Sequence, residues 1–434
     1  MPYIIGFKGF FKSKTRDSSA IAIDYIRGLI LAKLKNIEYI SDILEKSYNK
    51  LQHFISDSKW NYTPVLEKVA LEVQEMLPKV PLRGLLMDES GWVKKGNKSV
   101  GVAHQYCGNV GKTANSQVAV FAALCAGGLS AVVDAQLYLP QDWCNDPQRC
   151  EEAGIPKEKR KFRTKLEIAI DIIRNLIKIG IHFDFIGGDG FYGHDLQLAK
   201  KIDDLQITFV LDIHSTDKIY LEEPLFSVKK RKNKDANELK LDSKGISAKN
   251  YCQQLDRQQW KTLIIRDTAK GVLKAEYHFC EVFVVDKEEK KSYRRILIIQ
   301  RKENSKKEFE YKYSFSNGSF DRYSETDLAY MQGQRFFIEQ SFKELKQQLG
   351  LDQFQTRKWL SWYHQATLNI LVGSFLLKEK IFNLEEMPII SARDIMDFLF
   401  FRFMKNLTEE QLLQQLRKRH QQRYADINRY YTDD

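Results

Sequence analysis

Two aspartates stand where a carboxylate could take part in catalysis, each at the end of an apolar segment. Asp88 closes LRGLLMD at 82–88, and Asp189 closes FDFIGGD at 183–189. Both segments are typical of buried strands, and the carboxyl ends of sheet strands are favoured places for functional sites. Glycines on both sides of Asp189 let backbone and ligand approach closely. For each aspartate taken alone, capping of a turn is the competing interpretation.

A third carboxylate, Glu339, lies on an expected helix that contains QRFFIEQSFKELKQQL at 334–349. At about 100° per residue, four polar residues share an arc of about 60°, namely Gln332, Arg335, Glu339 and Lys346. The adjoining arc is apolar and would pack the helix on a sheet; it contains Ile338, Phe342, Leu345 and Leu349. Glu344 falls outside both arcs, and we expect it to point to solvent. An ordinary charged helix face is the competing interpretation.

The chemistry that three carboxylates support is the binding of a hard cation. Oxygen ligands without Cys or His suit Mg²⁺, with Mn²⁺ as a substitute. Two such ions, about 3.5–4 Å apart, can activate an attacking oxygen and stabilise a leaving one in phosphodiester chemistry. We therefore expect Asp88, Asp189 and Glu339 to be catalytic metal ligands. Arg335 and Lys346, on the same helix face, would then bind phosphate.

The composition favours a polyanionic partner and disfavours several other classes. The 434 residues include 68 Lys+Arg and 57 Asp+Glu, a formal net charge of +11, which suits nucleic acid. Six cysteines without C-x-x-C and eight histidines without H-x-x-x-H indicate neither a zinc site nor a redox pair, and His104 and His194 are interpreted as structural. No run of about 18 apolar residues and no secretory signal is visible, so we expect a soluble, cytoplasmic protein without membrane contact.

The elements that must position these residues follow from changes of hydrophobic period along the chain. Helical spacing over 1–80 predicts a small helical domain with basic faces. Strands followed by alternating helices and strands over 81–213 predict a mixed α/β sheet with helices packed on it. Antiparallel alternation predicts a β-rich insertion at 214–322. Helical patterns then predict a last part of the core at 323–378, with the Glu339 helix, and a helical region at 379–434.

Three segments resemble the acidic signature regions of DDE transposases from bacterial insertion sequences. They are MDES (87–90), GGDGFYG (187–193) and RFFIEQSFKELKQQLGLDQF (335–354). The resemblance covers about 20–380 and is strongest to a branch with a β-rich insertion and a Y-x2-R-x3-E-x6-K signature. Arg335, Glu339 and Lys346 fit that spacing. The tyrosine position holds Gln332, with Tyr330 two residues upstream, which places a hairpin route in question.

The resemblance implies an RNase H-like fold and a DNA-joining activity. It implies that the helices of 1–80 bind DNA ends, and that a homodimer holds two ends in a synaptic complex. Metal-dependent cleavage at the terminal inverted repeats would precede strand transfer into target DNA, in the nucleoid of a bacterium. Two alternatives stay open. One is a catalytically silent DNA-binding relative that acts as a repressor, and the other is an RNase H-like nuclease that cuts without joining.

Further DNA contacts are expected from two sources. The signature helix would contribute Gln332, Tyr330, Arg335 and Lys346. The basic loop PKEKRKFRTK at 156–165 could hold phosphates beside the cleft, although a solvated loop is the competing interpretation; its cations are Lys157, Lys159, Arg160, Lys161, Arg163 and Lys165.

Overall fold

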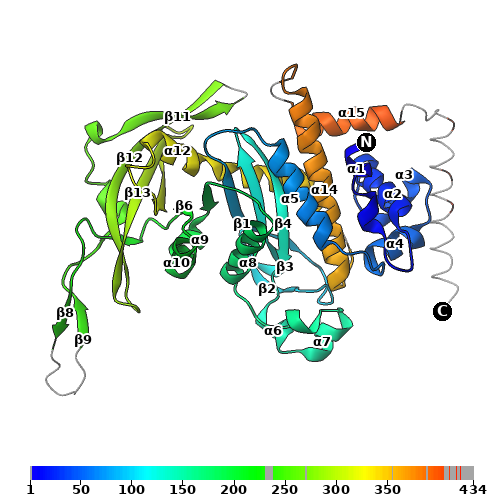
Figure 1. Cartoon of the computed structure of the whole chain (residues 1–434), viewed down its shortest axis with the longest axis horizontal. Helices are drawn as coiled ribbons and strands as arrows, with labels where there is room; N and C mark the ends of the chain where they lie inside the picture. The colour runs from blue at the N-terminus through cyan, green and yellow to red at the C-terminus, as the bar shows by residue number, and fades with distance from the viewer. Residues whose placement is uncertain are drawn as a thin grey trace.

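A ten-stranded mixed sheet forms the centre of the computed structural model, which describes residues 2–229, 238–268, 271–353, 355–387, 390–404, 410, 417 and 421. The strand order is β11-β12-β13-β14-β6-β5-β1-β3-β2, and β4 pairs with β3 (Figure 1). The core strands are β1 (Gly84–Val93), β2 (Ala103–Cys107), β3 (Lys112–Ala126), β4 (Leu129–Leu137), β5 (Phe185–Gly188) and β6 (Thr208–Asp212). Strands β1, β5 and β6 are mutually parallel, whereas β3 runs antiparallel to both β1 and β4.

The predicted α/β class, a mixed sheet flanked by helices, is therefore confirmed. The helices that follow β4 are α6 (Gln141–Cys144), α7 (Pro147–Glu152), α8 (Lys165–Lys178), α9 (Gly190–His194) and α10 (Leu196–Asp204), with the 3-10 turn η2 (Lys157–Lys159). Helices α12 (Glu325–Gln334) and α13 (Phe336–Gln347) lie against the core strands as well. In the described part of the chain, no helix combines the length and the apolar character needed to cross a membrane.

Strand β1 continues beyond the expected turn at Asp88. The parallel pairing with β5 stops at Met87, whereas the antiparallel pairing with β3 goes on to Val93. The extension is held by Trp92, which is buried and donates from Nε1 to Gln117 Oε1 at 3.1 Å. Asp88 therefore lies inside β1, at the point where its parallel neighbour ends.

The β-rich insertion is an extension of the core sheet. Its long strands are β11 (Lys261–Thr268), β12 (Gly271–Asp286), β13 (Lys291–Glu303) and β14 (Phe309–Ser316). Strand β14 pairs antiparallel with β6, with Phe315 opposite Leu211, so ladder hydrogen bonds connect the insertion to the core. Its smaller elements are β7 (Lys218–Ile219), β8 (Phe226–Lys229), β9 (Glu238–Leu241), β10 (Ile246–Ser247), α11 (Ala248–Cys252) and η3 (Arg257–Gln259).

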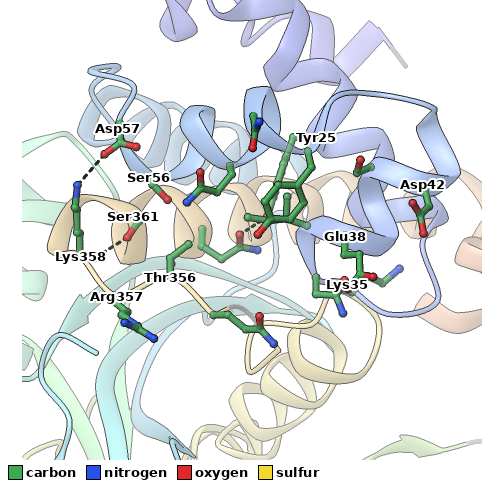
Figure 2. Close-up of a pocket in the computed structure, with 18 residues that line it drawn as sticks. Tyr25, Lys35, Glu38, Asp42, Ser56, Asp57, Thr356, Arg357, Lys358 and Ser361 are labelled. Atoms are coloured by element: carbon green, nitrogen blue, oxygen red, sulfur yellow. Dashed lines mark hydrogen bonds and ion pairs between the residues drawn. The ribbon is translucent and has the colours of Figure 1, made fainter. Parts of the chain in front are cut away.

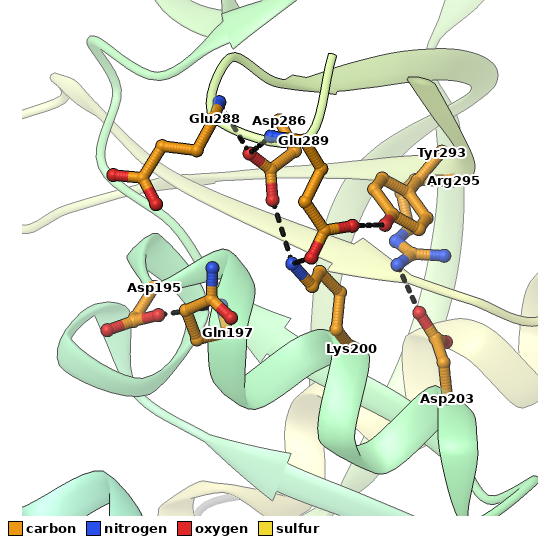
Figure 3. A network of polar contacts seen from close by, with 9 residues as sticks. All are labelled: Asp195, Gln197, Lys200, Asp203, Asp286, Glu288, Glu289, Tyr293 and Arg295. Carbon is orange, nitrogen blue, oxygen red and sulfur yellow. Dashed lines mark hydrogen bonds and ion pairs between the residues drawn. The ribbon is translucent and has the colours of Figure 1, made fainter. Parts of the chain in front are cut away.

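A network of charged side chains also fixes the insertion to helix α10 (Figure 3). Lys200 donates from Nζ to Asp286 Oδ2 at 2.9 Å and also pairs with Glu289. Arg295 on β13 pairs with Asp203 at the end of α10. The contact with Lys200 is the largest cause that lowers the pKa of Asp286. The insertion is thus held both by the sheet and by ion pairs.

The N-terminal helices share a core with a long helix from the other end of the chain. They are α1 (Pro2–Ile5), η1 (Lys8–Phe11), α2 (Ser19–Leu31), α3 (Ile37–Leu44), α4 (Tyr48–Ser56) and α5 (Thr63–Met76), and they pack around α14 (Trp359–Asn383). Figure 1 shows α1 to α4 on the side of α14 away from the insertion, close to α15 (Ala392–Met404). Tyr25 donates from its hydroxyl to Gln365 Oε1 at 2.6 Å. Most of the expected C-terminal tail after Met404 lies outside the described residues.

We expect His364→Ala to lower the Tm by about 3 °C at pH 7, because His364 joins these two parts of the core. Its ring stacks on Trp60 at 3.8 Å, and its two nitrogens lie 2.9 Å from Ile55 O and 3.0 Å from Trp60 O. Loss of a buried ring of this size costs about 3 kcal/mol. Thermal melts should show the loss, with exposed His104→Ala on β2 as the control.

The destabilisation caused by His364→Ala should be smaller at acid pH than at pH 7. Burial lowers the pKa of His364 to about 4, so the unfolded chain binds this proton more readily than the folded one. Wild-type stability that depends on neutral His364 is therefore present above about pH 6.5 and is lost as the pH falls toward 4. The Tm gap between wild type and His364→Ala should narrow at pH 5. A gap that widens there would contradict the assignment.

Candidate functional site

Three aspartates occupy equivalent positions on three neighbouring parallel strands. Met87 on β1 pairs with Gly188 on β5, and Gly188 pairs with Leu211 on β6. The next residues along the chain are Asp88 within β1, Asp189 directly after β5 and Asp212 at the end of β6. Residues in register on parallel strands about 4.8 Å apart point to the same face. The parallel register therefore brings Asp88, Asp189 and Asp212 side by side at one edge of the pairing.

Asp212 is a member of this group that the sequence analysis missed. The segment ITFVLDI at 207–213 has the same signal as the other two, an acid that closes a buried strand. Its carboxylate is already surrounded by donors: Ser314 Oγ donates to Oδ1 at 2.6 Å, and Lys312 Nζ lies 3.2 Å from Oδ2. These partners come from β14 of the insertion.

The side chain of Arg335 contacts acids on both α13 and the core strands. Its Nε lies 2.8 Å from Asp212 Oδ2, its Nη2 lies 2.7 Å from Glu339 Oε1, and its Nη1 lies 4.0 Å from Asp88 Oδ2. The contact to Asp212 is close enough for an ion pair but is not aligned as a hydrogen bond. Burial opposes the charge of Arg335, yet the surrounding carboxylates raise its pKa. One guanidinium thus faces several acids at once.

The positive charge near Asp88 and Asp189 does not offset the burial of their carboxylates, so their pKa values are raised. Burial, and then the charge of Asp189, raise the pKa of Asp88 well above its usual range, while Arg335 lowers it in part. Burial, and then the charge of Glu89, raise the pKa of Asp189, although its Oδ1 accepts from Phe191 N at 3.0 Å. Glu339 differs, since half of its side chain is exposed and its carboxylate pairs with Arg335. Arg335 thus lies between this carboxylate and Asp88, and oxygen ligands of this kind suit a hard divalent cation.

Asp88 and Glu89 point to different partners, as their neighbouring positions on a strand require. Asp88 faces Arg335, whereas Glu89 Oε1 accepts from Lys165 Nζ at 2.9 Å. Lys165 is the first residue of α8, so the basic loop ends against β1 beside the aspartates. Elsewhere in that loop, Arg163 pairs with Asp171 at 2.6 Å and Arg160 Nε donates to Ile155 O. Its exposed cations are Lys157, Lys159 and Lys161.

The helix that was expected to run through Gln332 is interrupted at Arg335, which lies between α12 and α13. Gln332 is therefore on α12 and does not share the polar arc. Its side chain is buried, and its Nε2 donates to Ser314 Oγ at 2.8 Å. Ser314 in turn donates to Asp212, so Gln332 supports the site from behind. In this arrangement it does not reach the surface, and its DNA contact stays a prediction.

The remaining residues of the predicted helix face occupy varied surroundings. Lys346 is half-buried and donates from Nζ to Gly91 O at 3.3 Å; burial lowers its pKa. The hydroxyl of Tyr330 accepts from Gly127 N at 3.2 Å, in the turn between β3 and β4. The expectation that Glu344 faces solvent is wrong. It is half-buried, and burial raises its pKa, because α14 packs on α13 and covers that side.

We expect Asp88→Asn to raise the Tm of the metal-free protein by about 2–4 °C at pH 7. The raised pKa means that the folded chain binds this proton more tightly than the unfolded chain does. Stability is therefore lost as the pH rises from about 4 through the folded-state pKa, and Asn removes that loss. Melts in EDTA from pH 4 to 8 should show a gap that grows with pH. A lower Tm for Asp88→Asn at pH 7 would mean that Arg335 already offsets the burial cost.

A large cavity lies apart from these carboxylates. It has a volume of about 860 Å³ and lies between the N-terminal helices and residues 355–365 (Figure 2). Its lining mixes charges of both signs, including Lys35, Arg357 and Lys358 with Asp42 and Asp57. Lys358 Nζ is already paired with Asp57 Oδ1 at 2.8 Å. The cavity therefore has no single charge that would select an anion.

Comparison with known proteins gives a family match and one curated relative. The model of the DDE superfamily endonucleases matches residues 7–272, a range that includes the three aspartates and ends before Glu339. The probable transposase for insertion sequence element IS701 from Microchaete diplosiphon is 32% identical over 172 residues, which are 38% of this chain and 40% of that protein. The match thus spans about two fifths of the length of that relative.

Two solved structures overlap loosely with the fold. A chain of the piggyBac transposase synaptic complex with hairpin DNA gives a TM-score of 0.40 at 12% identity, covering 92% of this chain and 76% of that one. The NurA nuclease from Sulfolobus solfataricus gives 0.26 at 9% identity, covering 75% and 92%. Overlaps of this size add nothing about the site.

Proposed function

The chain belongs to the DDE superfamily of endonucleases, and from this premise we propose that it is a DNA transposase. It would cut at the terminal inverted repeats of an insertion sequence and join the freed 3′-hydroxyl to target DNA. The observation that carries the proposal is the register of β1 and β5, which sets Asp88 beside Asp189, with Arg335 facing both Asp88 and Glu339. The partial match to the IS701 transposase supports the same assignment.

Asp88, Asp189 and Glu339 would hold the divalent cations, Mg²⁺ with Mn²⁺ as a substitute, and two ions are proposed. The residues fit such ions because the burial and mutual repulsion of two aspartates are relieved by added positive charge. When bound, the ions would activate the attacking oxygen and stabilise the leaving one. Asp212 is assigned a different role, since Lys312, Ser314 and Arg335 already surround its carboxylate.

The chain's own cations would bind and orient the DNA. Arg335 pairs through Nη2 with Glu339, and its guanidinium is partly exposed. If Glu339 turned toward a cation, Nη2 would become free for a phosphate oxygen, while Nε stayed on Asp212. The exposed Lys157, Lys159 and Lys161 would contact the duplex backbone beside the site. Because joining needs two ends at once, we propose a homodimer on the DNA, acting in the bacterial nucleoid.

Product analysis tests the proposed function. The purified full chain is incubated with Mg²⁺, duplex DNA of its element's end and a target plasmid, and products are resolved on denaturing gels. We expect cleaved ends and joined strands, and neither with Asp88→Asn. Cleavage without joining would favour the nuclease alternative, and end binding without cleavage would favour the silent DNA-binding relative.

Hairpinned ends should be scarce in that experiment. Position 332 holds an amide, which cannot stack on a base as a phenol ring does, and this amide is buried against Ser314. The fraction of hairpinned ends is read from the same gels, under conditions where joined products form. Abundant hairpins that persist in Gln332→Ala would show that another residue fills the role, and Tyr330→Phe and Tyr330→Ala would then be compared.

A further inference from the structure

A second cluster of side chains that could bind a metal lies at the end of α9, and none of its members belongs to the carboxylate site. His194 is the last residue of α9, and His214 and Asp217 lie in the turn that follows β6. One ligand atom from each residue lies within 4.8 Å of the others, in a search that covered the described residues. His194 Nδ1 is 2.7 Å from Asp217 Oδ1. The two imidazole rings are stacked, with centroids 4.7 Å apart.

Backbone hydrogen bonds hold the two ligands of the turn in place. The backbone N–H of His214 donates to Asp217 Oδ2 at 3.0 Å, and the N–H of Asp217 donates to His214 O at 3.0 Å. Helix α11 holds the turn from outside, since Ala248 N donates to Asp217 O at 2.9 Å. On the other side, a side chain at position 190 would meet the His214 ring at 3.1 Å, and Gly190 leaves that room. The turn is therefore held firmly, while His194 is mostly exposed and able to adjust.

The ligand set differs in kind from that of the carboxylate site. Two imidazoles and one carboxylate suit Zn²⁺ and related borderline cations, whereas an all-oxygen set suits Mg²⁺. Zinc bonds of about 2.0–2.1 Å place tetrahedral donor atoms about 3.3 Å apart, which a rotation of the exposed His194 can achieve. Three protein ligands leave a fourth position for water or another oxygen ligand.

We propose that His194, His214 and Asp217 form a binding site for one Zn²⁺-class ion. The ion would replace the proton between His194 Nδ1 and Asp217 Oδ1, and the imidazole would keep its other proton on Nε2. Asp189 is the N-cap residue of α9, so the ion would connect the other end of this short helix to the beginning of the insertion. The site does not depend on the proposed transposase function.

The experiment uses the untagged full chain, stripped with EDTA and returned to excess Mg²⁺ so that the carboxylate site is filled. Co²⁺ is then added as an optical probe, and Zn²⁺ is titrated against a chromogenic chelator. We expect one equivalent of Zn²⁺ that Mg²⁺ does not displace, visible absorption bands of Co²⁺ bound to nitrogen, and a higher Tm with Zn²⁺. Asp88→Asn should retain all three.

Variants decide whether the cluster is the site. In His194→Gln/His214→Gln, Zn²⁺ affinity should fall at least tenfold and the Co²⁺ bands should vanish. Asp217→Asn, which can keep an acceptor for His214 N, should also weaken Zn²⁺ binding while the metal-free Tm changes little. The control is His104→Gln/His182→Gln, which removes two exposed histidines elsewhere. Wild type that binds no Co²⁺ in the presence of Mg²⁺, or a cluster variant that keeps the full equivalent, would overturn the proposal.

Discussion

Glu339→Gln should reduce Mg²⁺-dependent cleavage of end DNA by about a thousandfold or more, while Glu344→Gln cleaves nearly as well as wild type. Both residues are glutamates on α13, so composition cannot separate them. Glu339 is exposed, and its Oε1 lies 2.7 Å from Nη2 of Arg335, which also faces Asp88. Loss of a ligand carboxylate removes charge stabilisation that is needed in the transition state.

The matched control is informative because Glu344 is the more buried of the two. It accepts from Gln340 Nε2 at 3.1 Å, and burial raises its pKa. Gln keeps the shape of the side chain, whereas Ala would leave a partly buried gap on the side covered by α14. Cleavage is measured on labelled end duplexes, and binding is measured in EDTA, where both variants should match wild type. If Glu344→Gln failed to cleave and Glu339→Gln cleaved normally, Glu339 would not be the third catalytic acid. The proposed phosphate contacts of Arg335 and Lys346 would then be wrong as well.

Asp212→Asn should lower cleavage by about one to two orders of magnitude at limiting Mg²⁺ and also destabilise the protein. Asp212 is the ion-pair partner of both Arg335 and the partly buried Lys312. Removal of its charge leaves Lys312 without this partner and takes one of the facing carboxylates from Arg335, so the protein should lose stability. Arg335, released from Asp212, would pair more closely with Asp88 and Glu339. It would then compete with Mg²⁺ for these two carboxylates.

A positioning role for Asp212 predicts a changed dependence on Mg²⁺, which a purely structural role does not. Raised Mg²⁺ should restore much of the cleavage by Asp212→Asn. The double variant Asp212→Asn/Lys312→Met should regain stability, since it removes the cation that lost its partner, yet keep the higher Mg²⁺ requirement. Ser314→Ala, which removes an uncharged hydrogen-bond donor to the same carboxylate but leaves the charge of Asp212 in place, should stay within about threefold of wild type. If the Mg²⁺ dependence of Asp212→Asn equals that of wild type, Asp212 does not position Arg335.

The fold class and two of the proposed site acids could be read from the sequence because their signals are local. An apolar run that ends in an acid marks Asp88 and Asp189 wherever the strands are placed. The same signal stands at Asp212, but nothing in the chain nearby tells that β6 lies next to β5. That neighbour relation comes from hydrogen bonds between segments far apart in sequence.

The polar helix face around Glu339 was predicted less completely. A fixed rotation of about 100° per residue assumes one unbroken helix and takes no account of the elements that pack on it. Gln332 lies in the core and not in the expected cleft, because β14 covers it and Ser314 receives its amide. The packing of α14 covered Glu344, which a count of residues per turn placed in solvent. Both differences come from contacts with elements that lie elsewhere in the chain.

The sequence by itself determined the alternation of strands and helices, the basic charge, the acids at the strand ends and the spacing of Arg335, Glu339 and Lys346. Only the tertiary structure decided that β14 joins the insertion to β6, that Asp212 holds Arg335, and that His194 lies against His214 and Asp217. The physical reason is the range of the interactions. Periodicity and capping act within a few residues, whereas strand register, helix coverage and ligand clusters depend on which distant surfaces pack together.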